Sequence, residues 1–148
     1  MTTKAIYFDM DGTIADLYGI ENWLEKLRTF DPTPYEQAKP LLRLQPLARV
    51  LNTLQKKGYT IGVISWLSIG STPEYDEAVA KAKTEWLKVH LKSVQFDEIH
   101  ITAYGVPKPS CAECPLGILF DDNEGIRNSW QGKAYEPANI MDILRALK

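Results

Sequence analysis

Short apolar runs that alternate with helical patterns constrain this chain more than any other feature. Such runs predict buried strands at residues 4–8, 60–64, 98–102 and 118–120, and a fifth, short strand at 132–135. Between two of them, Leu47, Val50, Leu51 and Leu54 recur at helical spacing before the helix-breaking Gly58. This alternation predicts an α/β fold, a Rossmann-like doubly wound parallel sheet with helices on both faces.

Two further helices are predicted towards the end of the chain. The longer runs from about Pro73 to Leu91, and the last spans residues 137–147. Ser71 or Thr72 is a candidate cap for the longer helix, with Glu74 completing a capping box. Its inward side is formed by Tyr75, Ala78, Val79, Ala82, Trp86 and Leu87. The last helix turns Ile140, Met141, Leu144 and Leu147 inward.

Length and charge limit the classes of protein and partner. The 148 residues suit one domain over 1–148, and a net charge of -2 does not favour binding to a long nucleic acid. No apolar run approaches the roughly 20 residues of a membrane helix, so no membrane partner is expected. The start of the chain lacks the pattern of a signal peptide, which predicts a cytoplasmic protein. The composition leaves the oligomeric state open.

The two cysteines form an isolated pair. Cys111 and Cys114 have the spacing of a zinc motif, but a structural zinc site normally needs four ligands and there is no second pair. Free thiols fit a reducing compartment. We therefore expect both cysteines to be loop residues without a metal.

Residues 16–45, called the insertion below, differ from the rest of the chain in their proline content and in their short helical patterns. They contain Pro32, Pro34 and Pro40 between two helical patches, at 20–30 and 35–44. We expect a small helical cap lying over a site. One apolar face would contain Trp23, Leu24, Leu27 and Phe30, the other Leu41, Leu42 and Leu44. The two faces can cover each other, and since neither is long enough to fold alone, both should lean on the main domain.

Polar side chains stand where three of the predicted strands end. Asp9 and Asp11 follow the first strand, Ser65 the second, and Asp121 with Asp122 the fourth. Ligands of parallel sheets bind outside these carboxyl ends. Carboxylates held close together repel each other unless a cation intervenes, and oxygen ligands suit Mg²⁺. Either acidic pair alone is equally consistent with turn formation, but four converging carboxylates predict a magnesium site that handles a phosphate ester.

Four motifs, in order, resemble those of the haloacid dehalogenase superfamily of phosphohydrolases. The first is the stretch from Asp9 to Thr13, and the last is Phe120-Asp121-Asp122-Asn123. Between them lie Ser65, in Ile64-Ser65-Trp66, and Lys108, in Pro107-Lys108-Pro109. The resemblance covers the chain from Lys4 to about Tyr135. Within the superfamily the chain is most similar to small 5'(3')-deoxyribonucleotidases, although its insertion is shorter than their cap.

The resemblance implies a role for each matched residue. Asp9 would be the nucleophile that forms an aspartyl-phosphate, and Asp11 the general acid and base. Ser65 and Lys108, with Met10, would hold phosphoryl oxygens.

The same resemblance implies a metal centre and its support. Mg²⁺ would be bound by Asp9, the backbone carbonyl of Asp11 and Asp122, with Asp121 further out. Gly12 would permit the sharp turn after the first strand, and Thr13 would orient Asp11. At the mouth of the site, Trp66 would either stack on a nucleobase or pack under the insertion.

The expected activity is therefore Mg²⁺-dependent hydrolysis of a phosphomonoester, with a nucleotide such as a deoxyribonucleoside monophosphate as the substrate. An alternative substrate is the phosphorylated end of a nucleic acid, or another small phosphomonoester. A hypothesis of a different class is a nucleotide- or phosphate-binding module that turns over slowly.

Overall fold

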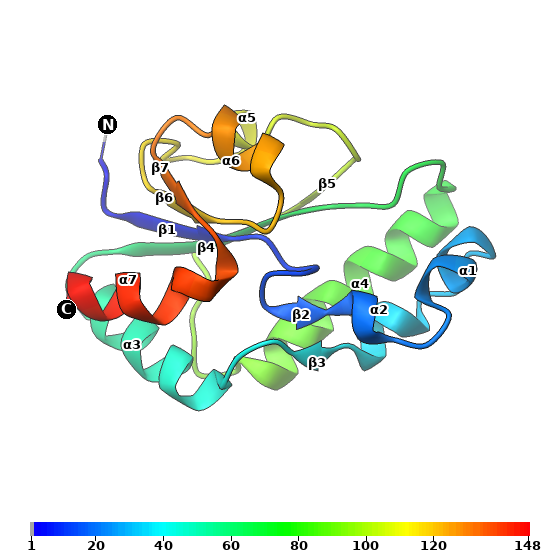
Figure 1. Ribbon diagram of the computed structural model, residues 1–148, viewed down its shortest axis with the longest axis horizontal. Coiled ribbons are helices and arrows are strands. Elements are labelled where there is room, and N and C mark those ends of the chain that lie inside the picture. The colour runs from blue at the N-terminus through cyan, green and yellow to red at the C-terminus, as the bar shows by residue number, and fades with distance from the viewer. Residues whose placement is uncertain (1) are drawn as a thin grey trace.

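The computed structural model, which describes residues 2–148, contains a five-stranded parallel sheet (Figure 1). Its strands are β1 (Ala5–Phe8), β4 (Thr60–Trp66), β5 (Glu98–Thr102), β6 (Ile118–Phe120) and β7 (Lys133–Tyr135), in the spatial order β5-β4-β1-β6-β7. All four pairings are parallel. The predicted parallel sheet is confirmed, and the strand bounds differ from the predicted ones by at most two residues.

Helices flank both faces of the sheet. They are α3 (Leu44–Lys56), α4 (Pro73–His90), α5 (Lys108–Cys111), α6 (Glu124–Ser129) and α7 (Ile140–Leu147), the last preceded by a 3₁₀ turn, η2 (Pro137–Asn139). Ile6 and Phe8 of β1 face a large core that includes residues of α3, α4 and α7. Ala5 and Tyr7 face a smaller core on the other side, with residues of α5 and α6. This alternation follows from the two-residue period of a strand.

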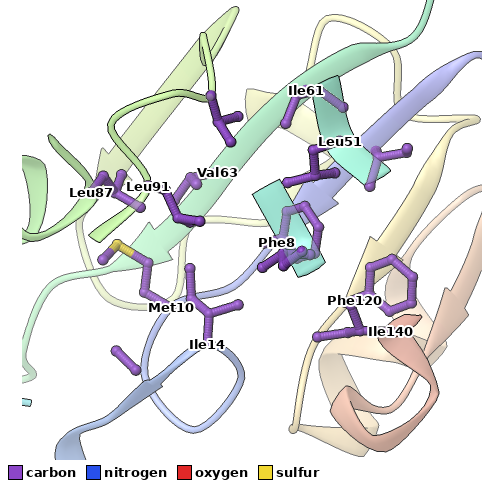
Figure 2. Packing of buried hydrophobic residues seen from close by; sticks show 14 of the residues in the cluster. Phe8, Met10, Ile14, Leu51, Ile61, Val63, Leu87, Leu91, Phe120 and Ile140 are labelled. Atoms are coloured by element: carbon purple, nitrogen blue, oxygen red, sulfur yellow. The ribbon is translucent and has the colours of Figure 1, made fainter. Parts of the chain in front are cut away.

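The large core packs the centre of the sheet against α3, α4 and α7, which lie below the sheet in Figure 1; Figure 2 shows part of this core. Phe8 of β1 stacks on Phe120 of β6 with 5.4 Å between ring centroids. Leu51 and Ile140 bring α3 and α7 into the same cluster. Adjacent strands β1 and β6 are therefore held rigidly at the point where the chain leaves both of them.

The strand order identifies where a ligand should bind. From β1 the chain continues to β4 and β5 on one side, and returns to β6 and β7 on the other. The order therefore reverses between β1 and β6, and such a switch point opens a crevice at the carboxyl ends of the strands. Asp9 lies at this point, and its N–H donates to the Phe120 carbonyl at 2.9 Å.

The predicted capping box of α4 is wrong. Thr72 is the cap, and its side-chain oxygen accepts from the N–H of Tyr75 at 3.2 Å. With Thr72 as the cap, the third helical position belongs to Tyr75, so Glu74 falls one residue too early to return the second bond.

The insertion contains the two expected helical regions, but the second is shorter than predicted. It comprises η1 (Leu17–Gly19), α1 (Trp23–Arg28) and α2 (Thr33–Gln37) between two short antiparallel strands, β2 (Ala15–Asp16) and β3 (Lys39–Pro40). The predicted helix over 35–44 is wrong because the residue before a proline favours extended backbone, so α2 ends ahead of Pro40. Leu44 instead begins α3.

The two apolar faces of the insertion do not cover each other, because Leu27 and Leu42 pack against different clusters of the main domain. The expected contact with the main domain is present: the insertion packs against α4, beside which it lies in Figure 1. Tyr35 joins a buried cluster with Tyr75 and Val79 of α4. The Trp86 indole N–H donates to the Ala38 carbonyl at 2.8 Å. Of the apolar residues of α1, Leu27 packs against this cluster, whereas Leu24 is left 43% exposed.

No helix within residues 2–148 is long and apolar enough to cross a membrane.

Candidate active site

The turn after β1 folds around one carbonyl and one glycine. The Met10 carbonyl accepts from the backbone N–H groups of Thr13, Ile14 and Ala15 at 3.0–3.1 Å. Gly12 adopts a φ of +80°, and a Cβ there would lie 2.3 Å from Oδ2 of Asp122. The Met10 side chain is buried in the large core, so a phosphate contact from this residue would have to come from its backbone N–H.

Asp9 is held from two sides. Its Oδ1 accepts from the Lys108 ammonium at 3.0 Å, and its Oδ2 accepts from the Thr13 hydroxyl at 3.1 Å. The Thr13 oxygen in turn accepts from the N–H of Asp122 at 3.2 Å. Thr13 therefore orients Asp9 and ties it to the loop after β6, whereas the sequence had suggested that it orients Asp11.

Lys108 is a buried cation between two carboxylates. It begins α5, is 2% exposed, and donates to Asp9 at 3.0 Å and to Asp121 at 2.7 Å. Burial disfavours its ammonium form, but the carboxylates of Asp9 and Asp121 outweigh burial and raise the pKa of Lys108 above its ordinary value. Lys108 is thus a fixed positive charge in contact with Asp9.

The two acids after β6 differ in their surroundings. Asp121 is buried, with one oxygen on Lys108 and the other accepting from the N–H of Asn123 at 3.0 Å. Asp122 is exposed as a residue, yet partial burial of its carboxyl group and the neighbouring Asp9 carboxylate raise its pKa to about 7. One oxygen each from Asp9, Asp121 and Asp122 lie within 4.8 Å of one another.

Asp11 and Ser65 meet at a lysine that the sequence analysis did not single out. The Lys83 ammonium lies 3.0 Å from Oδ2 of Asp11 and donates to the Ser65 hydroxyl at 2.7 Å. Burial and the nearby Asp9 carboxylate raise the pKa of Asp11, and Lys83 opposes them. The signal was present in the sequence: Lys83 stands four residues after Val79 and three before Trp86, on the inward side of α4.

A cavity of about 550 Å³ opens above these groups. Asp9, Asp11, Ser65, Lys108, Asp121 and Asp122 all line it, so the structure brings these six predicted residues together. Much of the remaining lining is apolar or aromatic. The insertion supplies Leu17, Tyr18, Trp23, Leu24, Leu27, Arg28 and Tyr35, and other loops supply Trp66, Tyr104 and Ile126 among others.

Trp66 forms a fixed part of the cavity wall. Its indole N–H donates to the Val106 carbonyl at 2.8 Å, and its ring packs against Tyr104 with 5.1 Å between centroids. The Lys108 ammonium lies 5.8 Å from the centre of the Trp66 ring. The ring therefore lies beside the charged groups of the cavity.

The cysteines lie outside this constellation. Cys111 ends α5 and Cys114 follows in a loop, and both are free and half-buried. Cys111 is thus helical, not a loop residue as predicted. Its thiol lies 3.8 Å from the Pro107 carbonyl.

Neither a model of a known protein family nor a curated protein matches this sequence. The function must therefore be inferred from the side chains that meet at the switch point of the sheet.

Proposed function

We propose that this protein is a Mg²⁺-dependent phosphomonoester hydrolase of the haloacid dehalogenase type. The observation that carries the proposal is the arrangement around Asp9. One of its oxygens contacts the buried Lys108 cation, and further carboxylates stand within 4.8 Å on the floor of an open cavity. A nucleophile, a cation for phosphoryl oxygens and oxygen ligands for a divalent metal are the parts that phosphoryl transfer requires.

The charge balance of the site favours a divalent cation. Four carboxyl groups, those of Asp9, Asp11, Asp121 and Asp122, stand with two ammonium groups, those of Lys83 and Lys108, so acids outnumber bases even with Arg28 of the insertion in the cavity lining. Oxygen donors without sulfur or imidazole suit Mg²⁺.

The two acids after β6 can be ranked by the contacts they already make. Asp121 is buried with both oxygens engaged by Lys108 and Asn123, whereas Asp122 is exposed and contacts no lysine among the described residues, so Asp121 would act from outside the coordination sphere. Asp9, Asp122 and the Asp11 carbonyl would hold the ion. When bound, Mg²⁺ offsets the repulsion between the Asp9 carboxylate and an anionic phosphate.

The chain's own residues then account for both halves of the reaction. Asp9 attacks phosphorus, the ester P–O bond breaks, and Asp11 donates a proton to the departing alcohol oxygen. In the second half, Asp11 accepts a proton from the water that attacks the aspartyl-phosphate, which frees Asp9 and inorganic phosphate. Lys108 and the Ser65 hydroxyl offset the charge on the phosphoryl oxygens throughout.

The cavity walls favour an ester with a planar, partly apolar alcohol group. Tyr18 and Trp23 of the insertion line the cavity, as do Trp66 and Tyr104. Aromatic side chains of this kind stack on planar groups. A nucleoside monophosphate, such as a deoxyribonucleotide, matches both the charged floor and the aromatic walls.

A panel of phosphomonoesters assayed with Mg²⁺ tests the proposal. We expect turnover of many equivalents of phosphate, with nucleoside monophosphates hydrolysed faster than glycerol 2-phosphate. Release of a single equivalent would instead identify a binding module that forms the covalent intermediate and stops. No release from any ester would refute the proposal.

The insertion should set substrate preference. Replacing Trp23 by alanine removes an aromatic wall without touching the charged floor, so we expect KM for a nucleoside monophosphate to rise about tenfold, in line with the roughly 1–3 kcal/mol of base–aromatic stacking. KM for 4-nitrophenyl phosphate should change less. Leu41→Ala, at an exposed residue of the insertion outside the cavity lining, is the control. An equal rise in KM for both esters would mean that Trp23 only supports the fold and does not contact the substrate.

The turn at Gly12 should be essential for a geometric reason. Gly12→Ala forces a positive φ on alanine and drives its Cβ into Asp122, so we expect both stability and Mg²⁺-dependent turnover to fall. Gly58→Ala is the matched control, because Gly58 has a φ of +94° with no atom within 4 Å of the added Cβ. Each variant should lose on the order of 1–3 kcal/mol in urea unfolding. An active Gly12→Ala enzyme would contradict the packing of Gly12 against Asp122.

A further inference from the structure

Among residues 2–148, two lysines near the cavity are buried, Lys83 and Lys108. The reaction outlined above gives a role to Lys108 but none to Lys83. Lysine side chains are usually exposed to solvent, but that of Lys83, in the middle of α4, is only 1% exposed. Burying an ammonium group is costly unless each of its N–H groups finds a partner. The groups that contact the Lys83 ammonium therefore indicate its role.

The three N–H groups of Lys83 have three acceptors. They are Oδ2 of Asp11 at 3.0 Å, Oγ of Ser65 at 2.7 Å and the Trp66 carbonyl at 2.8 Å. An ammonium group has three donors, so this set satisfies it completely. Lys83 differs from Lys108 in that it contacts Asp11 and Ser65, whereas Lys108 contacts the nucleophile Asp9 and Asp121.

These contacts act on two reacting groups at once. Because Ser65 Oγ accepts from Lys83, its own hydrogen is free to point to the cavity, where it can donate to a phosphoryl oxygen. Because Oδ2 of Asp11 is paired with Lys83, rotation of the Asp11 carboxyl group is restricted, and Asp11 lines the cavity in which the departing oxygen would lie. A general acid must be held within hydrogen-bond reach of the atom it protonates.

The insertion closes the remaining side of Lys83. The ammonium nitrogen lies 5.1 Å from the centre of the Tyr35 ring, in the range of a cation–π contact. The Tyr35 hydroxyl is 2.8 Å from the Ser68 hydroxyl, on the loop after β4. The ring thus shields Lys83 from water, which strengthens its bonds to Asp11 and Ser65.

We propose that Lys83 is a positioning residue that aligns the Asp11 acid with the leaving oxygen and turns the Ser65 hydroxyl toward the phosphoryl group. This inference rests on the proposed phosphohydrolase function. It predicts that Lys83 matters most where the leaving oxygen needs a proton. Alkyl phosphates such as glycerol 2-phosphate need one, whereas 4-nitrophenolate departs as a stable anion.

The test compares kcat/KM of Lys83→Met on these two esters with Mg²⁺ present. This parameter covers the steps up to loss of the alcohol, so it reports Asp11 as an acid and excludes its later role as a base. We expect kcat/KM to fall about 100-fold or more for glycerol 2-phosphate, within the range of general acid catalysis, and at least about tenfold less for 4-nitrophenyl phosphate. Lys88→Met, at a lysine of α4 that is 68% exposed, should change neither value.

The outcomes separate the two proposals. A wild-type protein that hydrolyses no ester of the panel, nucleoside monophosphates included, would overturn the phosphohydrolase function and this inference with it. An active wild type whose Lys83→Met variant loses kcat/KM equally on both esters would overturn the inference alone, because a purely structural defect does not distinguish leaving groups.

A second variant covers the case in which Lys83→Met does not fold, as judged by circular dichroism. Lys83→Arg keeps the charge beside Asp11, but a planar guanidinium group cannot reproduce the three bonds of the ammonium group. We expect it to show the same bias against the alkyl ester, with a smaller loss. Equal kcat/KM losses on both esters would again overturn the inference.

Discussion

Asp9→Asn should lose phosphatase turnover by a factor on the order of 10³ or more, as expected when a covalent nucleophile is removed. The amide keeps the shape of the side chain and its contact with the Thr13 hydroxyl, but it cannot attack phosphorus. The measurement is release of phosphate from the best ester of the panel with Mg²⁺ present. Retention of more than about a tenth of wild-type turnover would exclude Asp9 as the nucleophile.

The same variant should remain folded in the absence of metal, because the lost ion pair with Lys108 and the relieved repulsion among the carboxylates act in opposite directions. Asp9 shares its surroundings with Asp121 and Asp122, and each raised pKa in this cluster reflects in part the Asp9 carboxylate. Removing that charge relieves the repulsion but also costs Lys108 one of its two carboxylate partners, while its ion pair with Asp121 remains. Thermal unfolding checks this, with Asp142→Asn, at an exposed aspartate of α7, as the control for both measurements. A large loss of stability would mean that Asp9→Asn fails through the fold and not through chemistry.

The frame of the sheet was predictable because its signals are local. Buried parallel strands are short apolar runs, and the reactive residues stand directly after them, so Asp9 and Asp121 could be placed at the carboxyl ends from the sequence. Convergence of β1 and β6 then follows from the strand order. Thr13 was assigned to the wrong partner because its hydroxyl reaches back four residues to Asp9, and side-chain direction within a tight turn cannot be judged from spacing.

The insertion and Lys83 were harder to predict for a common physical reason. Their roles depend on contacts between distant segments, such as Tyr35 above α4 and Lys83 beneath the end of β4. An amphipathic pattern indicates that a face is buried, but not against what, so Leu44 was grouped with the insertion when it belongs to α3. A lysine on an apolar face predicts a buried charge but does not name its partners.

Removal of divalent metal should abolish turnover, and Mg²⁺ should restore it. Two ammonium groups leave the four carboxylates of the cavity with an excess negative charge, and an anionic phosphate would add to it. Without a cation, Asp9 must therefore approach phosphorus against electrostatic repulsion. The assay is phosphate release after treatment with a chelator and after stepwise return of Mg²⁺. Full activity in the chelator would contradict the charge argument.

Binding of the metal can be measured apart from catalysis. A cation that binds the folded but not the unfolded chain should raise the free energy of unfolding by about 2.7 kcal/mol when the cation concentration is 100 times its Kd. The rise in the free energy of unfolding should be smaller in Asp122→Asn. Asp122 is the carboxylate of the cluster that contacts no lysine among the described residues and is therefore available to the metal. The rise should persist in the control, Asp142→Asn. Ca²⁺ should also stabilise the fold yet support little turnover, since its longer and looser coordination misplaces the Asp9 carboxylate. Equal turnover with both ions would mean that the metal screens charge without positioning the nucleophile.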